Sequence, residues 1–458
     1  MAEQMMQGKA IEMVVKQTIP VGYKQTEVGV IPEDWDISII GDIANVKTGP
    51  FGSALHEKDY VHNGTPIITV EHLGEMGITD QNLPMVSDTD RIRLRAYQLD
   101  EGDIVFSRVG SIDRNALVTE NESGWLFSGR LLRVKLKSGC NSPKYISYHF
   151  HSTPFKKRVI EVAVGQTMPS LNTKILNGLL VVLPKTTEEQ TAIAAVLSDI
   201  DSLIVGLEQL IAKKQAIKTA TMQQLLTGLT RLPQFALRPD GTPKGYKSSE
   251  LGQIPEDWEV KTLRDMLAES PKYGINAPAV ELSRDTPAYI RITDINNDGY
   301  YRPTEKVGVR SIFSEQYVLH VNDIVLARTG ASVGKSYLYN VDDGQLVYAG
   351  FLIKISPLQK ILNSSYLFQF MKTKKYWDWV LVNSMRSGQP GINGAEFASM
   401  LIPTPSINEQ TAIATILTDM DSELTALEQK LAKARDVKQG MMQQLLTGRI
   451  RLPLSKEA

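Results

Sequence analysis

The chain contains two copies of one sequence unit, and this duplication limits the folds available to it. GYKQTEVGVIPEDW begins at Gly22 and GYKSSELGQIPEDW begins at Gly245. Near the other end of each copy, MQQLLTGLTRLP begins at Met222 and MQQLLTGRIRLP at Met442, about 220 residues later. A chain of 458 residues exceeds the size at which a single core stops growing, so we expect two domains built on the same plan.

The two copies are most alike at their ends. EEQTAIAAVLSDIDS around Glu189 returns as NEQTAIATILTDMDS around Glu409, whereas the middles share little beyond GDIVFSRVG from Gly102 and NDIVLARTG from Asn322. A common framework that carries two different recognition surfaces would show this pattern. The sequence therefore favours one framework with two unlike binding surfaces.

Two long segments without proline, from about Thr187 to Gly228 and from about Asn408 to Gly448, are predicted to be helices. Each carries apolar residues at alternating spacings of three and four, which is the seam of a coiled coil. Such a helix could instead pack on its own domain. Because both helices are long and their narrow seams match, we predict that they pair with each other in antiparallel fashion. The predicted seam residues are Leu197, Ile200, Ile204, Leu207, Ile211, Leu417, Met420, Leu424, Leu427 and Leu431.

The segments between the repeated ends contain short runs rich in β-branched residues and bounded by turn residues, which predict strands. Examples are TPIITV from Thr65 and AGFLIKI from Ala349, and a helix is expected around residues 145–162. Trp35 and Trp258 in the IPEDW segments are expected to anchor the cores. The predicted fold class is mixed α/β, with two β-rich α/β domains at opposite ends of an antiparallel coiled coil of two long helices and an internal pseudo-two-fold axis.

Composition gives little indication of the partner. The 50 basic residues nearly balance the 51 acidic ones and the formal net charge is -1, so any surface for nucleic acid must be local. The single cysteine, Cys140, excludes an internal disulfide and fits a reducing cytoplasm. The N-terminus lacks signal-peptide features, and no stretch approaches the roughly 20 apolar residues that span a bilayer. We therefore expect a soluble cytoplasmic protein without a membrane partner.

The motifs of common catalytic and metal sites are missing from the sequence. It has no HExxH, no paired CxxC and no Asn-Pro-Pro-aromatic tetrapeptide of the kind that amino-methyltransferases use. TGASVGKS from Thr329 resembles a phosphate-binding loop, but the spacing between its glycines is too short. His62 and His72 have no second ligand at metal spacing. We expect a binding protein without catalytic residues, a bound cofactor or a metal site.

Arg108 and Arg328 occupy equivalent places, each after a DIV strand and before a turn glycine. Arginine can bind phosphate or the edge of guanine through two parallel hydrogen bonds, although an ion pair with a nearby acid is an open alternative. Residues shared by both copies cannot distinguish different sequences. Their equivalence therefore suits contacts with the DNA backbone better than contacts with bases.

Loops with glycine and proline supply further candidates for DNA contact. Lys47 precedes such a turn in KTGPFGSAL, and Gln166 and Gln389 lie in VGQTMPSLN and SGQPGIN, at matching places before the long helices. A turn with no ligand role is the alternative in each case. Weaker candidates are Arg114 and Arg130 in the first domain and Arg291, Lys335 and Arg386 in the second.

With these features the chain resembles the specificity subunit of a type I restriction-modification system. The resemblance covers nearly the whole chain after about residue 20, and the duplicated arrangement is more specific than any single motif. The motifs that carry it are the openings at Gly22 and Gly245, EQTAIA at Glu189 and Glu409, LEQ at Leu207 and Leu427, and QQLLTGxxRLP at Gln223 and Gln443.

The resemblance implies a protein that binds a bipartite, asymmetric site in double-stranded DNA, with one target-recognition domain on each half. The long helices would act as a spacer and as a docking surface for two modification (methyltransferase) subunits, which two restriction (motor-nuclease) subunits would join. S-adenosylmethionine would be held by the modification subunits, and ATP and Mg²⁺ by the motor subunits. The predicted divisions are an N-terminal extension (1–21), the first target-recognition domain (22–186), the central helix (187–229), a linker with the second target-recognition domain (230–406), the C-terminal helix (407–449) and a tail (450–458).

Two other functions remain open on the sequence alone. A single-chain DNA methyltransferase or nuclease would need catalytic motifs, and methyl transfer by the purified chain without a partner would identify it. A duplicated protein-binding scaffold would need no DNA contact, and a complex without any sequence preference would identify that.

Overall fold

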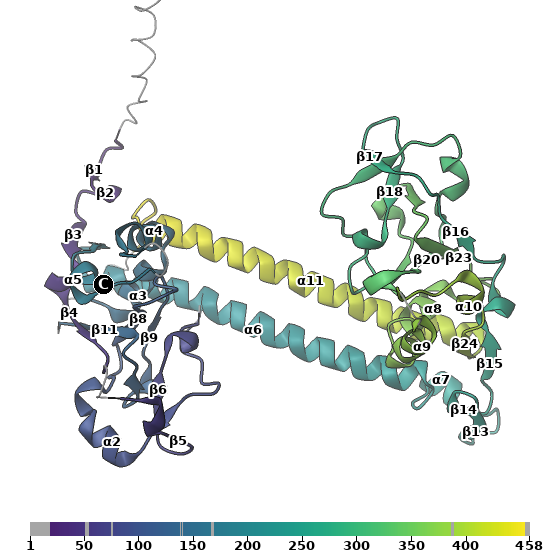
Figure 1. Ribbon diagram of the computed structural model, residues 1–458, viewed down its shortest axis with the longest axis horizontal. Helices are drawn as coiled ribbons and strands as arrows, with labels where there is room; N and C mark the ends of the chain where they lie inside the picture. The colour runs from purple at the N-terminus through teal and green to yellow at the C-terminus, as the bar shows by residue number, and fades with distance from the viewer. Residues whose placement is uncertain are drawn as a thin grey trace, which may run out of the picture. The chain divides into compact units, whose positions relative to one another are not determined.

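The computed structural model describes residues 19–50, 55–74, 77–137, 139, 141–165, 169–385 and 389–453. The chain divides into two compact units. The first unit comprises Met1–Glu208 and Lys430–Ala458, and the second unit comprises Gln209–Gln429. Each unit combines the globular part of one repeat with segments of two long helices, α6 (Thr187–Leu226) and α11 (Ile407–Leu445) (Figure 1). The mixed α/β fold class predicted from the sequence is confirmed.

Two four-stranded sheets form the globular part of the first unit. One sheet has the longer strands and is called the larger sheet; its order is β4-β11-β8-β9 and it is antiparallel. The other, called the smaller sheet, has the order β10-β6-β7-β5 with one parallel pair, β10 and β6. All residues of β8 are buried, because Ile104 and Phe106 pack in one hydrophobic cluster and Val105 packs in another. The strands are β4 (Ala44–Thr48), β5 (Tyr60–Val61), β6 (Thr65–Ile68), β7 (Met85–Val86), β8 (Ile104–Ser107), β9 (Asn115–Leu117), β10 (Leu126–Phe127) and β11 (Leu131–Leu136).

The second unit repeats this plan. Its larger sheet has the order β16-β23-β20-β21, and its smaller sheet has the order β17-β19-β18-β22 with the parallel pair β18 and β22. The corresponding strands therefore occupy the same places in both units, although the sequences of the middles differ. The strands are β16 (Lys272–Tyr273), β17 (Ala279–Glu281), β18 (Ala288–Ile290), β19 (Val307–Val309), β20 (Ile324–Ala327), β21 (Ser336–Leu338), β22 (Leu346–Tyr348) and β23 (Leu352–Ile355).

Two-stranded pairings surround each IPEDW segment. The proline of the segment ends the second strand of a hairpin, and the tryptophan follows it. Trp35 and Trp258 are fully buried, which confirms that they anchor the cores. The pairings are β1 (Tyr23–Thr26) with β2 (Gly29–Pro32), β3 (Asp36–Ile39) with β12 (Leu180–Leu183), β13 (Tyr246–Ser249) with β14 (Gly252–Pro255), and β15 (Glu259–Thr262) with β24 (Leu401–Thr404).

The helix expected around residues 145–162 is two helices, α3 and α4. Ser152 between them has an extended backbone, and its side chain caps α4 by accepting from Phe155 N at 3.4 Å. Pro154 lies in the first turn of α4 and cannot continue a preceding helix, which explains the break. The shorter helices are α1 (Ile40–Ile43), α2 (Asp88–Arg93), α3 (Pro143–His151), α4 (Thr153–Val162), α5 (Thr173–Asn177), α7 (Pro233–Ala236), α8 (Ser364–Phe370), α9 (Lys374–Ser384) and α10 (Gly394–Ala398).

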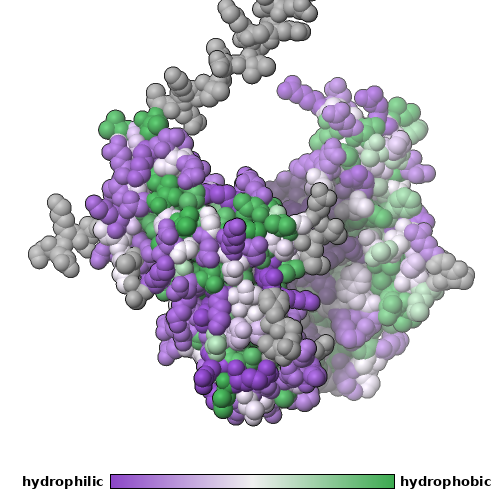
Figure 2. All heavy atoms as spheres, turned by 60° about the vertical axis from the view of Figure 1, so that its left-hand side comes forward, coloured by the Kyte–Doolittle hydropathy of each residue, from purple (hydrophilic) through white to green (hydrophobic). Residues whose placement is uncertain are grey.

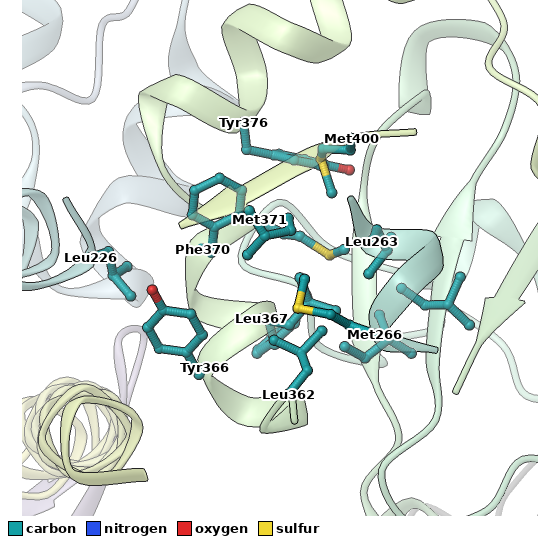
Figure 3. Packing of buried hydrophobic residues seen from close by; sticks show 14 of the residues in the cluster. Leu226, Leu263, Met266, Leu362, Tyr366, Leu367, Phe370, Met371, Tyr376 and Met400 are labelled. Atoms are coloured by element: carbon teal, nitrogen blue, oxygen red, sulfur yellow. The ribbon is translucent and has the colours of Figure 1, made fainter. Parts of the chain in front are cut away.

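The core of the second unit joins α6 to the globular part. Leu226 of α6 points toward Tyr366 of α8, and both are fully buried (Figure 3). Tyr366 also donates its hydroxyl to Pro403 O at 2.8 Å, so its polar end is satisfied inside the core. The end of the long helix is therefore part of the hydrophobic core.

Segments of α6 and α11 run antiparallel within each unit. In the second unit Lys214 Nζ lies 2.7 Å from Glu423 Oε1. In the first unit Arg435 Nη2 lies 2.6 Å from Glu208 Oε1. The predicted antiparallel pairing is thus confirmed for these segments. Of the predicted seam residues, Leu197, Ile204, Leu417, Leu424 and Leu427 are buried, and Ile200, Leu207, Ile211, Met420 and Leu431 are half-buried.

Helix α6 is more apolar in composition than the sequence analysis allowed for. By length and composition, α6 is the one described helix that could cross a membrane, with a mean hydropathy of 1.4 over 18 residues. A coiled-coil seam raises the mean hydropathy in the same way. Asp201 of α6 forms an ion pair with Lys438 of α11 at 2.6 Å, so α6 packs against another helix of the same chain. On the part of the molecule nearest the viewer in Figure 2, hydrophobic side chains form separate patches among hydrophilic ones.

Candidate functional site

Arg108 lies where three loops meet at one end of the larger sheet of the first unit. Its backbone N–H donates to Arg130 O at 2.9 Å, and its carbonyl accepts from Leu171 N at 2.8 Å. The neighbouring Gly110 donates its N–H to Pro169 O at 3.1 Å. Gly110 has a φ of +80°, which residues with a Cβ rarely adopt, so this turn requires glycine. Backbone hydrogen bonds therefore fix the loop that bears Arg108.

Arg328 lies in the same arrangement in the second unit. Its N–H donates to Phe351 O at 3.1 Å, and its carbonyl accepts from Ile392 N at 2.9 Å. Gly330, with a φ of +71°, donates to Pro390 O at 3.0 Å. The two copies thus build one loop framework twice, with an arginine at the same position.

A second cation occupies matching positions beside this framework. Ser107 N donates to Arg114 O at 2.8 Å, and Ala327 N donates to Lys335 O at 2.8 Å. Arg114 is exposed and Lys335 is half-buried. The predicted candidates Arg108, Arg114 and Arg130 therefore come from adjoining loops and strand ends of the first unit.

The side chains near Arg328 form a small polar and aromatic surface. The Arg328 guanidinium lies 4.9 Å from the centroid of the Tyr273 ring, which is a cation–π contact. Tyr273 Oη accepts from Gly394 N at 3.0 Å, so the ring is held in place. Gln389 is exposed, and its Nε2 lies beside Gly330, two residues after Arg328, where it would contact any added Cβ at 3.2 Å. The structure therefore brings Arg328 and Gln389 together.

Lys47 and Arg291 make contacts within their own domains. Lys47 Nζ donates to Ala96 O at 2.8 Å and lies 4.5 Å from the centroid of the Tyr97 ring, and burial lowers its pKa. The Arg291 guanidinium donates to both oxygens of Asp294, at 2.8 and 3.0 Å. This pairing raises the pKa of Arg291. Both cations therefore have partners within their own domains.

Three residues of the sequence analysis, Gln166, Arg386 and Cys140, lie outside the described residues. One exposed residue of the framework was missed. Phe351 occupies the place of Arg130, before the matching strand, and 59% of its surface is exposed. Alignment of GRLLRVKL from Gly129 with GFLIKISP from Gly350 would have paired the two. The shared framework therefore carries unlike side chains at this position.

A second repeated cluster closes each unit. In the first unit Arg451, from the end of the second copy, donates to Asp34 Oδ1 at 2.9 Å and to Glu189 Oε2 at 2.8 Å. Trp35 Nε1 donates to the same carboxylate at 3.3 Å. The end of one copy is thus fastened to the opening of the other.

The second unit has the same cluster with the copies exchanged. Arg231 Nε donates to Glu409 Oε1 at 2.6 Å and its Nη1 to Asp257 Oδ1 at 2.8 Å, and Trp258 Nε1 donates to Glu409 Oε2 at 3.1 Å. Burial raises the pKa of Asp257, but hydrogen bonds from Arg231 and Lys244 outweigh it and lower the pKa to about 2. Among the described residues, no group of three or more His, Cys, Asp or Glu side chains could hold a metal ion.

Comparison with known proteins gives matches over both copies. A family model described as "Type I restriction modification DNA specificity domain" matches residues 32–219 and again residues 255–434. The putative type I restriction enzyme MjaX specificity subunit of Methanocaldococcus jannaschii is 28% identical over 458 aligned positions, which cover 94% of this chain and 97% of that protein. The EcoBI specificity subunit of Escherichia coli is 21% identical, over 92% of this chain and 87% of that protein.

A solved structure has a similar fold. The S subunit of a type I restriction-modification system from M. genitalium aligns with a TM-score of 0.57 at 14% identity, over 92% of this chain and 97% of that chain. The similarity extends over nearly the whole length of both chains, so it includes both globular parts and both long helices.

Proposed function

Because the chain belongs to the family of type I restriction-modification specificity subunits, which are non-catalytic, we propose that its two globular parts each read one half of an asymmetric site in double-stranded DNA. The observation that carries the proposal is the loop framework built twice, with Arg108 and Arg328 at equivalent positions and Arg130 and Phe351 at another. Equivalent residues suit the DNA backbone, which has the same chemistry at both half-sites. Unlike residues suit base edges, which differ.

The chemistry of the framework fits this division of roles. Arg108 and Arg328 each offer a guanidinium that can bind phosphate oxygens through two hydrogen bonds. The exposed Arg130 can donate to O6 and N7 of guanine in the major groove, whereas the exposed ring of Phe351 can contact the methyl group of thymine. The two domains would then prefer different bases at corresponding positions.

We assign the first target-recognition domain to residues 22–186, a linker with the second target-recognition domain to residues 230–406, and the helices that separate them to residues 187–229 and 407–449. The helices would set the distance between the half-sites and offer docking surfaces to two modification subunits, which two restriction subunits would join. S-adenosylmethionine would be bound by the modification subunits, and ATP and Mg²⁺ by the restriction subunits. We place the assembled complex in the cytoplasm.

The test is to sequence methylated adenines in a host that expresses this chain with its modification and restriction partners. We expect two unlike half-sites separated by a fixed spacer. Arg130→Ala should relax the base preference in one half-site only, and Phe351→Ala should do so only in the other. A complex that methylates without sequence preference would contradict DNA reading and favour a scaffold. Methyl transfer to DNA by the purified chain alone would contradict its non-catalytic role.

A further inference from the structure

A cavity of about 450 Å³ in the second unit, the lysine cavity, lies beside α6 and the first turn of α9. Its lining has five lysines and two aspartates among the described residues. The chain as a whole has a net charge of -1, so this concentration of positive charge is local. The charged residues of the lining are Lys218, Lys335, Lys372, Lys374, Lys375, Asp298 and Asp378.

The two most buried of these lysines share one carboxylate. Lys218 forms an ion pair with Asp421, and Lys372 Nζ lies 3.4 Å from the other oxygen of Asp421. The side chains of Lys218 and Lys372 are only 10% and 14% exposed, so water screens them poorly. Two ammonium groups against one shared carboxylate leave an excess of positive charge at the inner wall of the lysine cavity. Asp298, which also lines the cavity and favours the charged form of Lys372, is exposed.

Lys372 is held rigidly in this position. Its Nζ lies 4.3 Å from the centroid of the Phe368 ring and 5.1 Å from that of Tyr300. Burial lowers the pKa of Lys372, and the charge of Asp421 opposes that effect. The ammonium group is therefore positioned before any ligand arrives, so an anion that enters the cavity meets an arranged cation.

The first unit contains the same cluster without the extra charge. Asp201 pairs with Lys438 at 2.6 Å and accepts from the hydroxyl of Tyr148 at 2.7 Å. His151 takes the place of Lys372, directly before the residue that caps the next helix. Burial lowers the pKa of His151 to about 4, so it is neutral at pH 7. One ammonium group and one carboxylate thus balance in the first unit.

A similar cavity of about 450 Å³ adjoins this balanced cluster. Its lining also includes cations, but two of them are already engaged: Lys438 pairs with Asp201, and Arg435 pairs with Glu208 at 2.6 Å. Lys156 and Arg158 also line this cavity, and the lysine cavity has a paired cation of its own, since Lys374 pairs with Asp378 at 2.6 Å. The difference between the two cavities is therefore the second ammonium group beside the shared carboxylate, Lys372, where the first unit has the neutral His151.

We propose that the lysine cavity binds a phosphate group. Lysine ammonium groups bind phosphate as point charges, and the hydroxyl of Ser336 in the lining can donate to a further phosphate oxygen. The volume exceeds that of a phosphate ion, so an organic group joined to the phosphate can lie against Trp377 at the rim. The phosphate can come from a small organic phosphate or from a DNA backbone. The proposal is independent of base reading at the loop framework.

The test uses the full chain with sodium phosphate as the probe and sodium chloride at equal ionic strength as the reference. Phosphate should raise the melting temperature of the chain and bind measurably by calorimetry. Lys372→His, which copies the first unit, should weaken this binding by about tenfold or more, because one charge-assisted contact is lost. Lys372→Arg should retain most of it, and the matched control His151→Gln in the first unit should leave it unchanged.

Circular dichroism of each variant would confirm that it folds. A response of the wild-type chain that is equal in phosphate and chloride would overturn the proposal, as would wild-type affinity in a folded Lys372→His variant.

The source of the phosphate follows from DNA binding measured against salt. If Lys372→His lowers the slope of log affinity against log salt by about one, the phosphate belongs to DNA. If the slope is unchanged while phosphate binding is lost, the ligand is a free organic phosphate. Neither result depends on base preference, which the methylation sites report separately. Failure of this proposal and failure of DNA reading are therefore distinguishable.

Discussion

The buried imidazole of His149 should make the first unit sensitive to acid. Its side chain lies in the core with 5% of the residue exposed, and neither ring nitrogen has a hydrogen-bond partner among the described residues. Burial, with a smaller contribution from the charge of Arg158, lowers the pKa of His149 from 6.5 to about 3. Because the folded pKa is depressed, the corresponding stability is fully present above pH 6.5 and is lost as the pH falls toward 3.

The size of the effect follows from this difference in pKa. At pH 5 the unfolded chain protonates His149 and the folded chain does not, which costs about 2 kcal/mol of unfolding free energy. At pH 4 the cost is about 3 kcal/mol. Phe370 occupies the equivalent place in the second unit. Tyr145, four residues before His149, donates its hydroxyl to Val182 O, and Tyr366, four residues before Phe370, donates its hydroxyl to Pro403 O in the matching strand. His149→Phe therefore copies a side chain that the same framework already accommodates.

The assay is urea unfolding at pH 7 and pH 5, followed by tryptophan fluorescence, with separate transitions fitted if the units unfold independently. We expect His149→Phe to lose about 2 kcal/mol less than the wild-type chain between these pH values. In the mirror variant Phe370→His, the second unit should lose a similar amount of unfolding free energy between pH 7 and pH 5. Equal losses in the wild-type chain and His149→Phe would refute the argument that burial keeps this imidazole neutral.

Three further predictions concern the ion-pair clusters around Arg231 and Arg451 (the junctions), contacts with the DNA backbone, and the two long helices. Glu409→Ala should destabilise the chain by about 3–5 kcal/mol in urea unfolding, because Arg231 is 7% exposed and loses a buried partner, whereas Glu189→Ala should cost less because Arg451 is 39% exposed. A greater cost for Glu189→Ala would contradict this. Arg108→Ala should lower the salt slope of DNA binding by about one without changing the bases read, and altered methylation sites would count against a backbone role. Removal of seven residues from each long helix should shorten the spacer between half-sites by about three base pairs, since seven residues rise roughly 10 Å, and an unchanged spacer would disprove the ruler role.

The duplication, the helices and their antiparallel pairing could be predicted because local sequence patterns determine them. The alternation at Leu417 and Leu424 needs only neighbouring residues to be recognised, and both are buried. The break between α3 and α4 was also visible in principle, because Pro154 cannot continue a helix. Trp35 and Trp258 could be identified as core residues because tryptophan buries a large apolar area and is usually packed in a core.

The environments of single side chains could not be predicted in this way. The burial of His149 depends on the aromatic residues that pack around it, including Phe155 at 5.6 Å between ring centroids. The pairing of Arg291 with Asp294 was foreseeable, since the two are three residues apart, but the contact of Lys47 with Ala96 joins distant segments. The sequence likewise gave no sign that the turn at Gly110 meets the segment at Pro169.

The contacts at the junctions give a physical reason for the uneven similarity of the two copies. Arg451 of the second copy binds Asp34 and Glu189 of the first, and Arg231 of the first copy binds the equivalent acids of the second. The same residue types thus form both junctions, and each junction joins residues of the two copies. A change at one of these positions in either copy would therefore disturb a contact with the other copy. Phe351 and its counterpart in the first unit lie at a loop end outside either junction, so they can differ without disturbing the framework. Under the proposed function, exchange of a middle segment should change one half-site while both clusters stay intact.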